Sequence, residues 1–299
     1  MAIINFGSMN LDLVYTMPRF VLPGETVSAE DYQCYCGGKG LNQSVAASLA
    51  GARVLHAGML GEGGEMLRDF LENSGVNTEM LGRTPVAQGR AIIQVSHSGE
   101  NSIILYHGSN YAVTEAYIDS VFRTVEHGSY LMLQNEVSGL SRIIDRACQA
   151  GCLVVLNPSP FEESLREIDL KKLSWLVLNE IEAAEMTGCQ DPEAALHTLR
   201  ESASELGIVL TLGSRGSLCA KGSQLIRQKS FPVKAVDTTG AGDTFTGYFI
   251  AALDAGADLP GALRRASAAA AIAVTRKGAA PAIPTAAEVD SFIAEACLS

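Results

Sequence analysis

The stretch AVDTTGAGDTFTGYF, from Ala235 to Phe249, places an aspartate, Asp243, directly after Gly-Ala-Gly. Gly240 and Gly242 allow the backbone to adopt positive φ and to approach a ligand closely. Apolar residues on both sides predict a loop that leads into a helix, whose first N–H groups attract anions. The stretch therefore indicates a loop that holds a phosphoryl group, with Asp243 placed to accept a proton. The alternative at this point is that Asp243 only caps the helix.

Two further segments carry polar side chains suited to a small hydroxylated ligand. GSMNLD at 7–12 ends an expected buried strand with Asn10 and Asp12, where a carboxylate can accept hydrogen bonds from two vicinal hydroxyls. Glu136 follows the expected strand YLMLQ, at the carboxyl end where ligands gather in parallel sheets. Taken singly, these residues also have ordinary structural interpretations. Asp12 fits a turn at the end of a strand, Glu136 fits an ordinary loop, and Lys39 of GGKGLN fits a solvated surface.

The composition disfavours several classes of protein. The chain has 299 residues, of which 47% are hydrophobic and 18% charged, so it is globular rather than disordered. Its formal net charge of −11 disfavours a bulk attraction to nucleic acid or anionic lipid but leaves room for a local site that binds a small anion. It contains no Walker loop, no GxGxxG fingerprint and no HExxH motif. The five histidines match no catalytic motif, and we expect them to be structural or solvated.

The cysteines and the N-terminus predict the compartment. Seven cysteines, an odd number without a C-x-x-C pair, predict reduced thiols rather than disulfides or a zinc site. The N-terminal segment lacks the basic start of a signal peptide and reaches Asp12 too early for one. A helix that spans a bilayer needs about 20 apolar residues, and no apolar run in the chain is that long. We therefore expect a soluble, cytoplasmic protein.

Strands alternate with helices along most of the chain. The expected strands are the apolar runs AIINF, RVLHAGML, YLMLQ, CLVVLN, WLVLN and GIVLTLG. The expected helices cover 40–51, 65–75, 114–125, 139–150, 167–172, 180–187, 192–204, 242–255, 259–275 and 285–297. Near-continuous apolar strands that alternate with helices predict an α/β fold with a mainly parallel sheet covered on both faces.

Two segments, 12–36 and 88–108, break this alternation. Their apolar and polar residues alternate, which predicts half-exposed antiparallel strands. We expect a single domain over 1–299, in which these segments are inserted into the α/β body and form a small β-sheet lid. A peripheral hairpin without a function is the alternative.

Seven collinear motifs resemble the ribokinase family of carbohydrate kinases, also called the pfkB family. The two most specific are DTTGAGDTFTG at 237–247 and CGGKGLNQSVAA at 36–47. GSMNLD, LNPSP, LNEIEAAE, TLGSRGS and AAAAIAVTRKGAAPAIP stand in the family's order and spacing, so the resemblance covers essentially the whole chain. It implies a three-layer αβα ribokinase-like fold with a mainly parallel central sheet and a small β-sheet lid.

The resemblance also implies roles for individual residues. In the family, the aspartate of G-A-G-D is the general base that deprotonates the sugar hydroxyl, and the preceding amides stabilise the transferring phosphoryl group. The catalytic residues implied here are Asp243, Gly240, Ala241 and Gly242. The sugar-binding residues implied are Asn10, Asp12, Gly38, Lys39, Gly40, Asn42, Glu136 and Asp243.

For the co-substrate and the ions, the resemblance implies ATP, Mg²⁺ and a K⁺ activator. The nucleotide-binding residues implied are Asn179, Thr211, Gly213, Ser214, Arg215, Gly216, Gly242 and Ser267. Asn179 and Glu182 match the element that orders Mg²⁺, partly through water, although Asn179 also fits a helix cap and Arg215 a surface arginine. The K⁺ ligands implied are Asp237, Thr239, Ala273, Arg276, Gly278 and Ala282.

Four positions depart from the family's pattern. Leu41 stands where alanine is usual, next to sugar-facing residues, and is expected to reshape the pocket. Thr246 stands where many members have asparagine, and Ser267 where histidine or asparagine often lies near the adenine. Ala282 replaces a serine found in some relatives, which removes a side-chain ligand from the K⁺ site.

The activity implied is ATP-dependent phosphorylation of D-ribose at O5 to ribose 5-phosphate, by a homodimer assembled through its lids. One alternative is a sibling kinase acting on deoxyribose, a nucleoside or another small sugar. Another is a non-catalytic sugar or nucleotide sensor on the same fold, which the intact G-A-G-D disfavours. No partner nucleic acid or membrane is expected.

Overall fold

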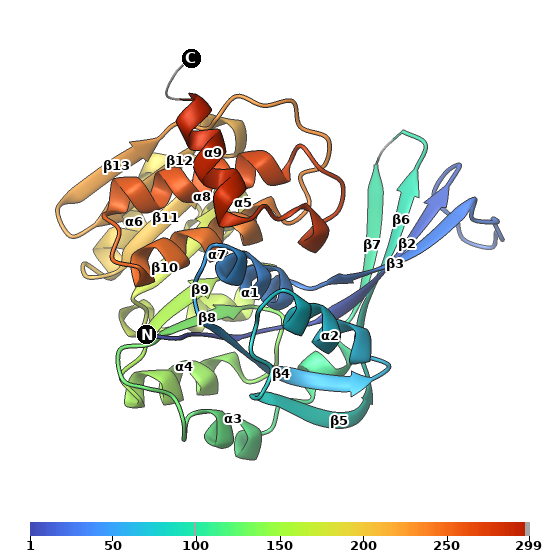
Figure 1. Cartoon of the computed structure of the whole chain (residues 1–299), viewed down its shortest axis with the longest axis horizontal. Helices are drawn as coiled ribbons and strands as arrows, with labels where there is room; N and C mark the ends of the chain where they lie inside the picture. Colours follow the sequence, from blue (N-terminus) through green and yellow to red (C-terminus); the bar gives the residue numbers. More distant parts are fainter. Residues whose placement is uncertain (99, 297–299) are drawn as a thin grey trace.

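The computed structural model describes residues 1–98 and 100–296 of the chain. Within them, nine strands form the main sheet, in the order β13-β12-β11-β10-β9-β8-β1-β4-β5 (Figure 1). Neighbours from β11 to β5 run parallel, and β12 and β13 are antiparallel at one edge. The strands are β1 (Ile3–Phe6), β4 (Val54–Glu62), β5 (Leu81–Ala87), β8 (Tyr130–Gln134), β9 (Leu153–Asn157), β10 (Trp175–Asn179), β11 (Gly207–Thr211), β12 (Ser217–Lys221) and β13 (Gln224–Gln228).

The central strands are buried on both faces of this sheet. Ile3 and Val155 belong to one hydrophobic cluster, and their neighbours Ile4 and Leu156 belong to another on the opposite face. This alternation explains why the central strands read as continuous apolar runs.

Helices cover both faces and complete three layers (Figure 1). On one side lie α1 (Lys39–Leu49), α2 (Glu65–Asn73), α7 (Ala241–Asp254), α8 (Leu259–Ala273) and α9 (Ala286–Ala296). On the other lie α3 (Glu115–Val121), α4 (Leu140–Gln149), α5 (Glu180–Thr187) and α6 (Pro192–Ser202). The predicted α/β class and three-layer architecture are confirmed.

None of the described helices is long and apolar enough to span a bilayer.

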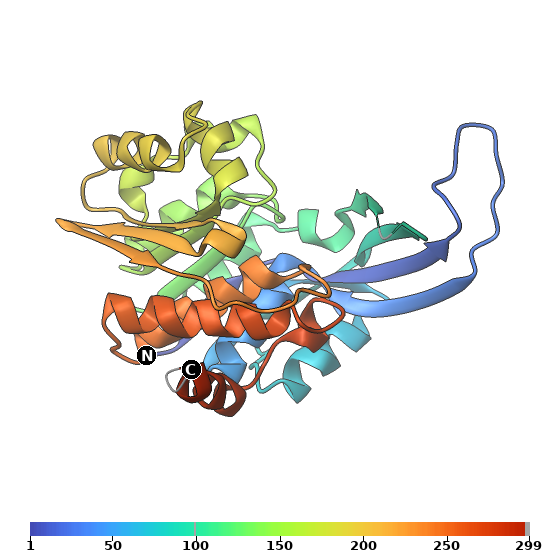
Figure 2. The same cartoon turned by 90° about the horizontal axis from the view of Figure 1, so that it is seen from above.

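Four more strands form a second, small sheet that projects from the body (Figure 2). Its order is β3-β2-β6-β7, with β2 at Asn10–Met17, β3 at Asp31–Gly37, β6 at Gly89–Ser96 and β7 at Asn101–Tyr106. The two expected segments therefore meet in one sheet, but the prediction that all its strands are antiparallel is wrong, because β2 and β6 pair in parallel. This pair joins two excursions far apart in the sequence, so no local pattern reveals its direction.

Most expected helices are present with small changes at their ends. Gly51 has φ of 99° just after α1, as a glycine that ends a helix often does. The helix expected at 114–125 is the shorter α3, and the segment 167–172 holds 3₁₀ turns rather than an α-helix. The expected end of the last helix at Cys297 lies outside the described residues. The described cysteines are the predicted free thiols: Cys34, Cys36, Cys148, Cys152, Cys189 and Cys219.

Candidate active site

Helices α1 and α7 pack closely enough to share hydrogen bonds between their side chains. A Cβ added to Gly247 of α7 would lie 2.5 Å from the Ala46 Cβ on α1. One turn earlier, Asp243 accepts hydrogen bonds from Asn42 Nδ2 and Gln43 Nε2, each at 3.0 Å. Because Asp243 meets Asn42 while Gly247 meets Ala46, the helices run in the same direction and begin side by side.

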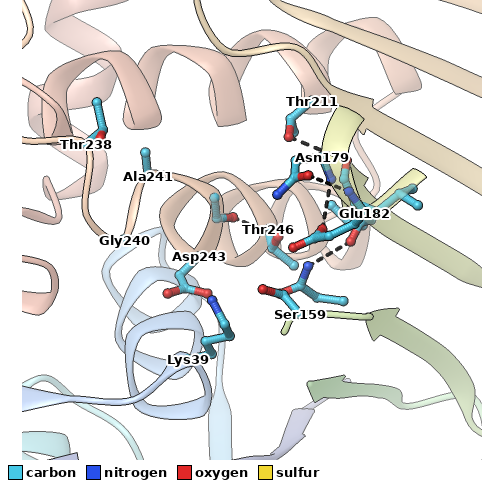
Figure 3. Close-up of a pocket in the computed structure, with 14 residues that line it drawn as sticks. Lys39, Ser159, Asn179, Glu182, Thr211, Thr238, Gly240, Ala241, Asp243 and Thr246 are labelled. Atoms are coloured by element: carbon cyan, nitrogen blue, oxygen red, sulfur yellow. Dashed lines mark hydrogen bonds between the residues drawn. The ribbon is translucent and has the colours of Figure 1, made fainter. Parts of the chain in front are cut away.

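The first turn of α7 opens onto a cavity of about 210 Å³ (Figure 3). Gly240 is the N-cap residue with φ of 73°, and no side chain caps the helix. The helix start can therefore receive an anion. A Cβ added to Gly242 would meet no atom within 4 Å, so the backbone is open there. The cavity is lined by Lys39, Asn157, Ser159, Val177, Leu178, Asn179, Glu182, Thr211, Thr238, Gly240, Ala241, Gly242, Asp243 and Thr246.

Two more carboxyl groups interact electrostatically with Asp243. Burial raises the pKa of Asp12 to about 7, and the charges of Glu136 and Asp243 add to the shift. Burial also raises the pKa of Glu136, although Lys39 and the hydrogen bond from Ser8 oppose it. Oε2 of Glu136 accepts hydrogen bonds from Ser8 Oγ at 2.5 Å and from the Lys39 amide at 3.1 Å.

Lys39 provides a positive charge beside these carboxyl groups. Burial lowers its pKa, but the charges of Asp243, Glu136 and Glu182 outweigh burial, and the net shift is upward. The side chain is therefore charged at neutral pH. Figure 3 shows it extending from α1 toward Asp243.

Glycines around the start of α1 allow a close approach to the segment that holds Ser8 and Asp12. A Cβ added to Gly37 would lie 2.0 Å from Asp12 Oδ2, and one added to Gly40 would lie 2.3 Å from the Ser8 amide. Gly38, the N-cap of α1, has φ of 93°. A side chain at Gly40 would therefore force the two backbone segments apart, whereas one at Gly37 would displace the Asp12 carboxyl group.

Asn10 and Asp12 are placed differently from the sequence expectation. They lie in β2 of the small sheet and not at the end of the buried strand β1. Asn10 is buried, and its Oδ1 accepts a hydrogen bond from Asn110 Nδ2 at 2.7 Å. Glu136 does follow the carboxyl end of β8, as predicted.

Across the cavity, Asn179 and Glu182 form a capping box at the start of α5 (Figure 3). Asn179 Oδ1 accepts from the Glu182 amide at 2.8 Å, and Glu182 Oε2 accepts from the Asn179 amide at 2.9 Å. The helix cap anticipated for Asn179 is therefore present, and both residues also line the cavity. Thr211 lines it too, from the end of β11.

Several expected nucleotide-binding residues lie outside the cavity lining. Arg215 is exposed and forms an ion pair with Glu180, which fits its interpretation as a surface arginine. Ser267 is buried in α8. The residues outside the lining are Gly213, Ser214, Arg215, Gly216 and Ser267.

The six residues expected to hold K⁺ occupy two adjoining loops. Asp237 Oδ1 accepts from the Thr239 amide at 3.0 Å, and Oδ2 accepts from the Gly278 amide at 2.9 Å. Burial raises the pKa of Asp237, but these hydrogen bonds and that of the Thr239 hydroxyl outweigh it, so the net shift is downward. Ala273, Arg276 and Ala282 lie in or beside the second loop. Asp237 thus ties the two loops together as an anion.

The structure places Leu41 in the core and brings to the site three residues that were not singled out from the sequence. Leu41 is fully buried in the hydrophobic core and is absent from the lining of the cavity beside Asn179 and Thr211, so its effect on the sugar pocket stays a prediction. Gln43, Ser159 and Thr238 reach the site without having been singled out. Their only signal was membership of the motifs at 36–47, 156–160 and 237–247. Among the described residues, no cluster of three or more His, Cys, Asp and Glu is placed to hold a metal ion.

Comparison with known proteins gives a consistent result. A family model described as pfkB family carbohydrate kinase matches residues 2–286. The chain is 35% identical over 300 residues to the ribokinase of Haemophilus influenzae, covering 97% of both chains. It is 31% identical over 308 residues to the deoxyribokinase of Salmonella typhi, covering 98% of this chain and 99% of the relative.

Solved structures agree with the fold described above. The crystal structure of the Thermotoga maritima ribokinase has a TM-score of 0.89 at 32% identity, covering 98% of this chain and 99% of the other. The Arabidopsis thaliana ribokinase, complexed with ribose and ATP, has a TM-score of 0.86 at 29% identity over the same shares.

The raised pKa of Asp12 predicts a pH-dependent stability. The folded protein keeps this carboxyl protonated up to about pH 7, whereas the unfolded chain ionises it near pH 4. Stability from this group is therefore complete below pH 4 and is lost at about 1.4 kcal/mol per pH unit until pH 7. Asp12→Asn cannot titrate, so its free energy of unfolding relative to wild type should rise from pH 4.5 to 7 and then level off. Urea unfolding at each pH measures this difference, and a constant difference would contradict the assignment.

Proposed function

Because the chain belongs to the pfkB family of carbohydrate kinases, we propose that it transfers the γ-phosphoryl group of ATP to O5 of D-ribose. The products are ribose 5-phosphate and ADP. The observation that carries the proposal is the position of Asp243, between the open first turn of α7 and the group formed by Asp12, Glu136 and Lys39. The ribokinase of Haemophilus influenzae, similar over the whole chain, supports ribose as the acceptor.

In this reaction Asp243 is the general base. It accepts the proton of the sugar hydroxyl as the oxygen attacks phosphorus, a role worth typically 10²–10⁴ in rate. The first-turn amides at Gly240, Ala241 and Gly242 stabilise the negative charge on the transferring group. Lys39, charged and directed at the same place, neutralises part of that charge.

The acceptor sugar occupies the side of Asp243 where the other carboxyl groups lie. Asp12 and Glu136 present acceptor oxygens, which suit the hydroxyls of a neutral sugar. Among the described residues, Asn42 Oδ1 is buried without a hydrogen-bond partner, and a sugar hydroxyl would satisfy it. Asn10, Gly38 and Gly40 complete this side by shaping the backbone around the sugar.

ATP occupies the cavity on the other side. Asn179, Glu182 and Thr211 line it, and Gly213, Ser214, Arg215, Gly216 and Ser267 belong to a part of the nucleotide site beyond that lining. Mg²⁺ would arrive with the nucleotide, since it keeps several waters and binds phosphates together with one or two carboxylates. It would supply neutralisation of the phosphate charge, with Glu182 and Asn179 orienting its waters.

A second candidate acceptor is deoxyribose. The deoxyribokinase of Salmonella typhi is similar to this chain over nearly its full length, at 31% identity. The two acceptors differ by the hydroxyl at C2 alone, so discrimination depends on a polar group that binds this hydroxyl.

A cytoplasmic location stays a prediction.

An acceptor screen with purified protein, ATP and Mg²⁺ tests the proposal. Among ribose, deoxyribose, fructose and nucleosides, ribose should give the highest kcat/KM. Asp243→Asn, which keeps the shape but not the base, should lower kcat at least about 100-fold while ATP still binds. Wild type that phosphorylates none of these acceptors would reject the proposal, and near-normal turnover by Asp243→Asn would reject the base.

We also propose that K⁺ activates the enzyme by holding the loop before α7. Support comes from Asp237, an anion that already links the loops at 236–239 and 273–278. A large, weakly hydrated cation between them would add carbonyl ligands from Thr239, Ala273, Arg276, Gly278 and Ala282. It would also lessen the repulsion between Asp237 and a nucleotide. The ion would fix the Gly240–Gly242 turn without contact with the substrates.

The K⁺ proposal predicts higher turnover in K⁺ than in Na⁺ at matched ionic strength in Tris buffer. Asp237→Asn keeps the size of the side chain but removes its charge, so it should abolish the difference. Glu180→Gln, which removes an exposed carboxylate near the nucleotide side, is the matched control and should keep it. Wild-type turnover that is indifferent to K⁺ would contradict the proposal.

We propose further that the small sheet is a lid through which two copies associate. Its edge strands β3 and β7 carry exposed apolar side chains, which proteins seldom leave uncovered. These are Tyr32, Tyr35, Ile103, Ile104 and Tyr106.

Light scattering at micromolar concentration should give the mass of a dimer. The double variant Ile103→Lys/Ile104→Lys should shift it to that of a monomer, because charges would be buried without partners. Leu225→Lys changes an equally exposed apolar residue on β13 and should leave the dimer intact. A monomeric wild type would refute the assembly.

A further inference from the structure

A chain of buried carboxamides leads from the strands of the main sheet to Asp243. Gln134 Nε2 in β8 donates to Asn5 Oδ1 in β1 at 3.0 Å and to Gln43 Oε1 in α1 at 2.7 Å. Gln43 Nε2 in turn donates to Asp243 Oδ1 at 3.0 Å and to Asn157 Oδ1 in β9 at 3.1 Å. Asn5, Gln43 and Gln134 are completely buried. We call Asn5, Gln134, Gln43 and Asn157 the amide chain.

We propose that the amide chain is a positioning device for Asp243, in which Gln43 is the contacting residue and Gln134 orients Gln43 from a distance. This inference rests on the proposed role of Asp243 as the base. It adds two residues, Gln43 and Gln134, that act on the reaction without contacting a substrate.

Two backbone carbonyls, which can only accept, set the direction of every amide in the chain. Asn5 Nδ2 donates to Gly40 O at 2.7 Å, so its oxygen faces Gln134. Gln134 must then present its NH₂ group, and Gln43 must meet it with oxygen. At the other end, Asn157 Nδ2 donates to Val177 O at 2.9 Å, so its oxygen faces Gln43. Gln43 is left one orientation, with NH₂ toward Asp243.

The orientation of Gln43 decides whether Asp243 receives a hydrogen bond from it. A flipped Gln43 would place Oε1 against Asp243 Oδ1 and Asn157 Oδ1, which are all acceptors. With the observed orientation, Gln43 and Asn42 each donate to a different oxygen of Asp243, and the carboxylate is held in one plane. A base held in this way is positioned before the substrate binds.

The energetic cost of the chain argues against a purely structural role. Gln134 Oε1 is buried and has no hydrogen-bond partner among the described residues. It fits only because Gly7 lacks a side chain, since a Cβ there would lie 2.4 Å from this oxygen. A leucine or methionine could fill the same space without an unpaired polar atom. The polar chain therefore stabilises the fold poorly but holds Gln43 in one orientation.

The experiment compares Gln43→Met, Gln134→Met and the double variant, using the acceptor that the wild type phosphorylates best. Methionine keeps the length of the side chain and removes its hydrogen bonds. Gln43→Met should lower kcat about 100-fold and Gln134→Met about tenfold, with little change in KM for either substrate. In the Gln43→Met background, Gln134→Met should lower kcat no further, because it acts only through Gln43.

Ser44→Ala is the control on the same helix. It removes a buried hydrogen bond to His56 Nδ1 that leads away from Asp243, so it should lower the Tm and leave kcat unchanged. If Gln134→Met lowered kcat by the same factor in the wild type and in the Gln43→Met background, the proposal would be overturned. It would also be overturned if Ser44→Ala lowered kcat as much as Gln134→Met does.

A readout without turnover separates this inference from the proposed function. The side-chain amide signals of Gln43 in a ¹⁵N-correlated NMR spectrum, assigned by their loss in Gln43→Met, should shift in Asp243→Asn and in Gln134→Met but not in Ser44→Ala. If no acceptor is phosphorylated, these shifts alone decide the matter. Signals that do not respond to Asp243→Asn would refute the contact even in an active enzyme.

Discussion

The close approach of α1 and α7 is the constraint on which the site depends. Gly247 permits it, because any side chain at this position would collide with Ala46. The two helices begin in different motifs, and Gln43 and Asp243 are 200 positions apart in the sequence. Their packing sets the polar start of α1 beside the first turn of α7. Helices further apart would separate Asp243 from its amide donors Asn42 and Gln43.

The fold was predictable wherever burial leaves a local pattern. The central strands, such as Leu153–Asn157, are apolar on both faces, and glycines such as Gly51 mark where helices end. The edge strands β5 and β13 were not foreseen, because their burial is partial and their sequences mix polar and apolar residues. The parallel pairing of β2 with β6 depends on contacts between distant segments and not on the residues of either.

The site was predictable in its residue types more than in its contacts. Asp243, Lys39 and Glu136 interact electrostatically at one place, as their motifs and, for Glu136, its position after a strand indicated. The burial of Leu41 in the core was not foreseen, because the direction of its side chain from the helix does not follow from its neighbours in sequence. Gln43 was overlooked because a glutamine on a helix has no chemical signal of its own. Its role becomes visible only from the hydrogen-bond partners that three other elements, β8, β9 and α7, place around it.

Charge divides the site into two halves. Asp12, Glu136 and Asp243 make the acceptor half acidic, and burial already raises the pKa values of Asp12 and Glu136 because two more charges are costly there. The phosphates of a nucleotide would face the Asp243 carboxylate and the acceptor oxygens of Asp12 and Glu136 there, whereas a neutral polyol can satisfy those oxygens with its hydroxyls. On the other half, the first turn of α7 offers N–H groups and no carboxylate of its own except Asp243. Asp243 stands at the boundary between the two halves. The N–H groups at the first turn of α7 suit a phosphoryl group on one side of it, and the acceptor oxygens of Asp12 and Glu136 suit a hydroxyl on the other.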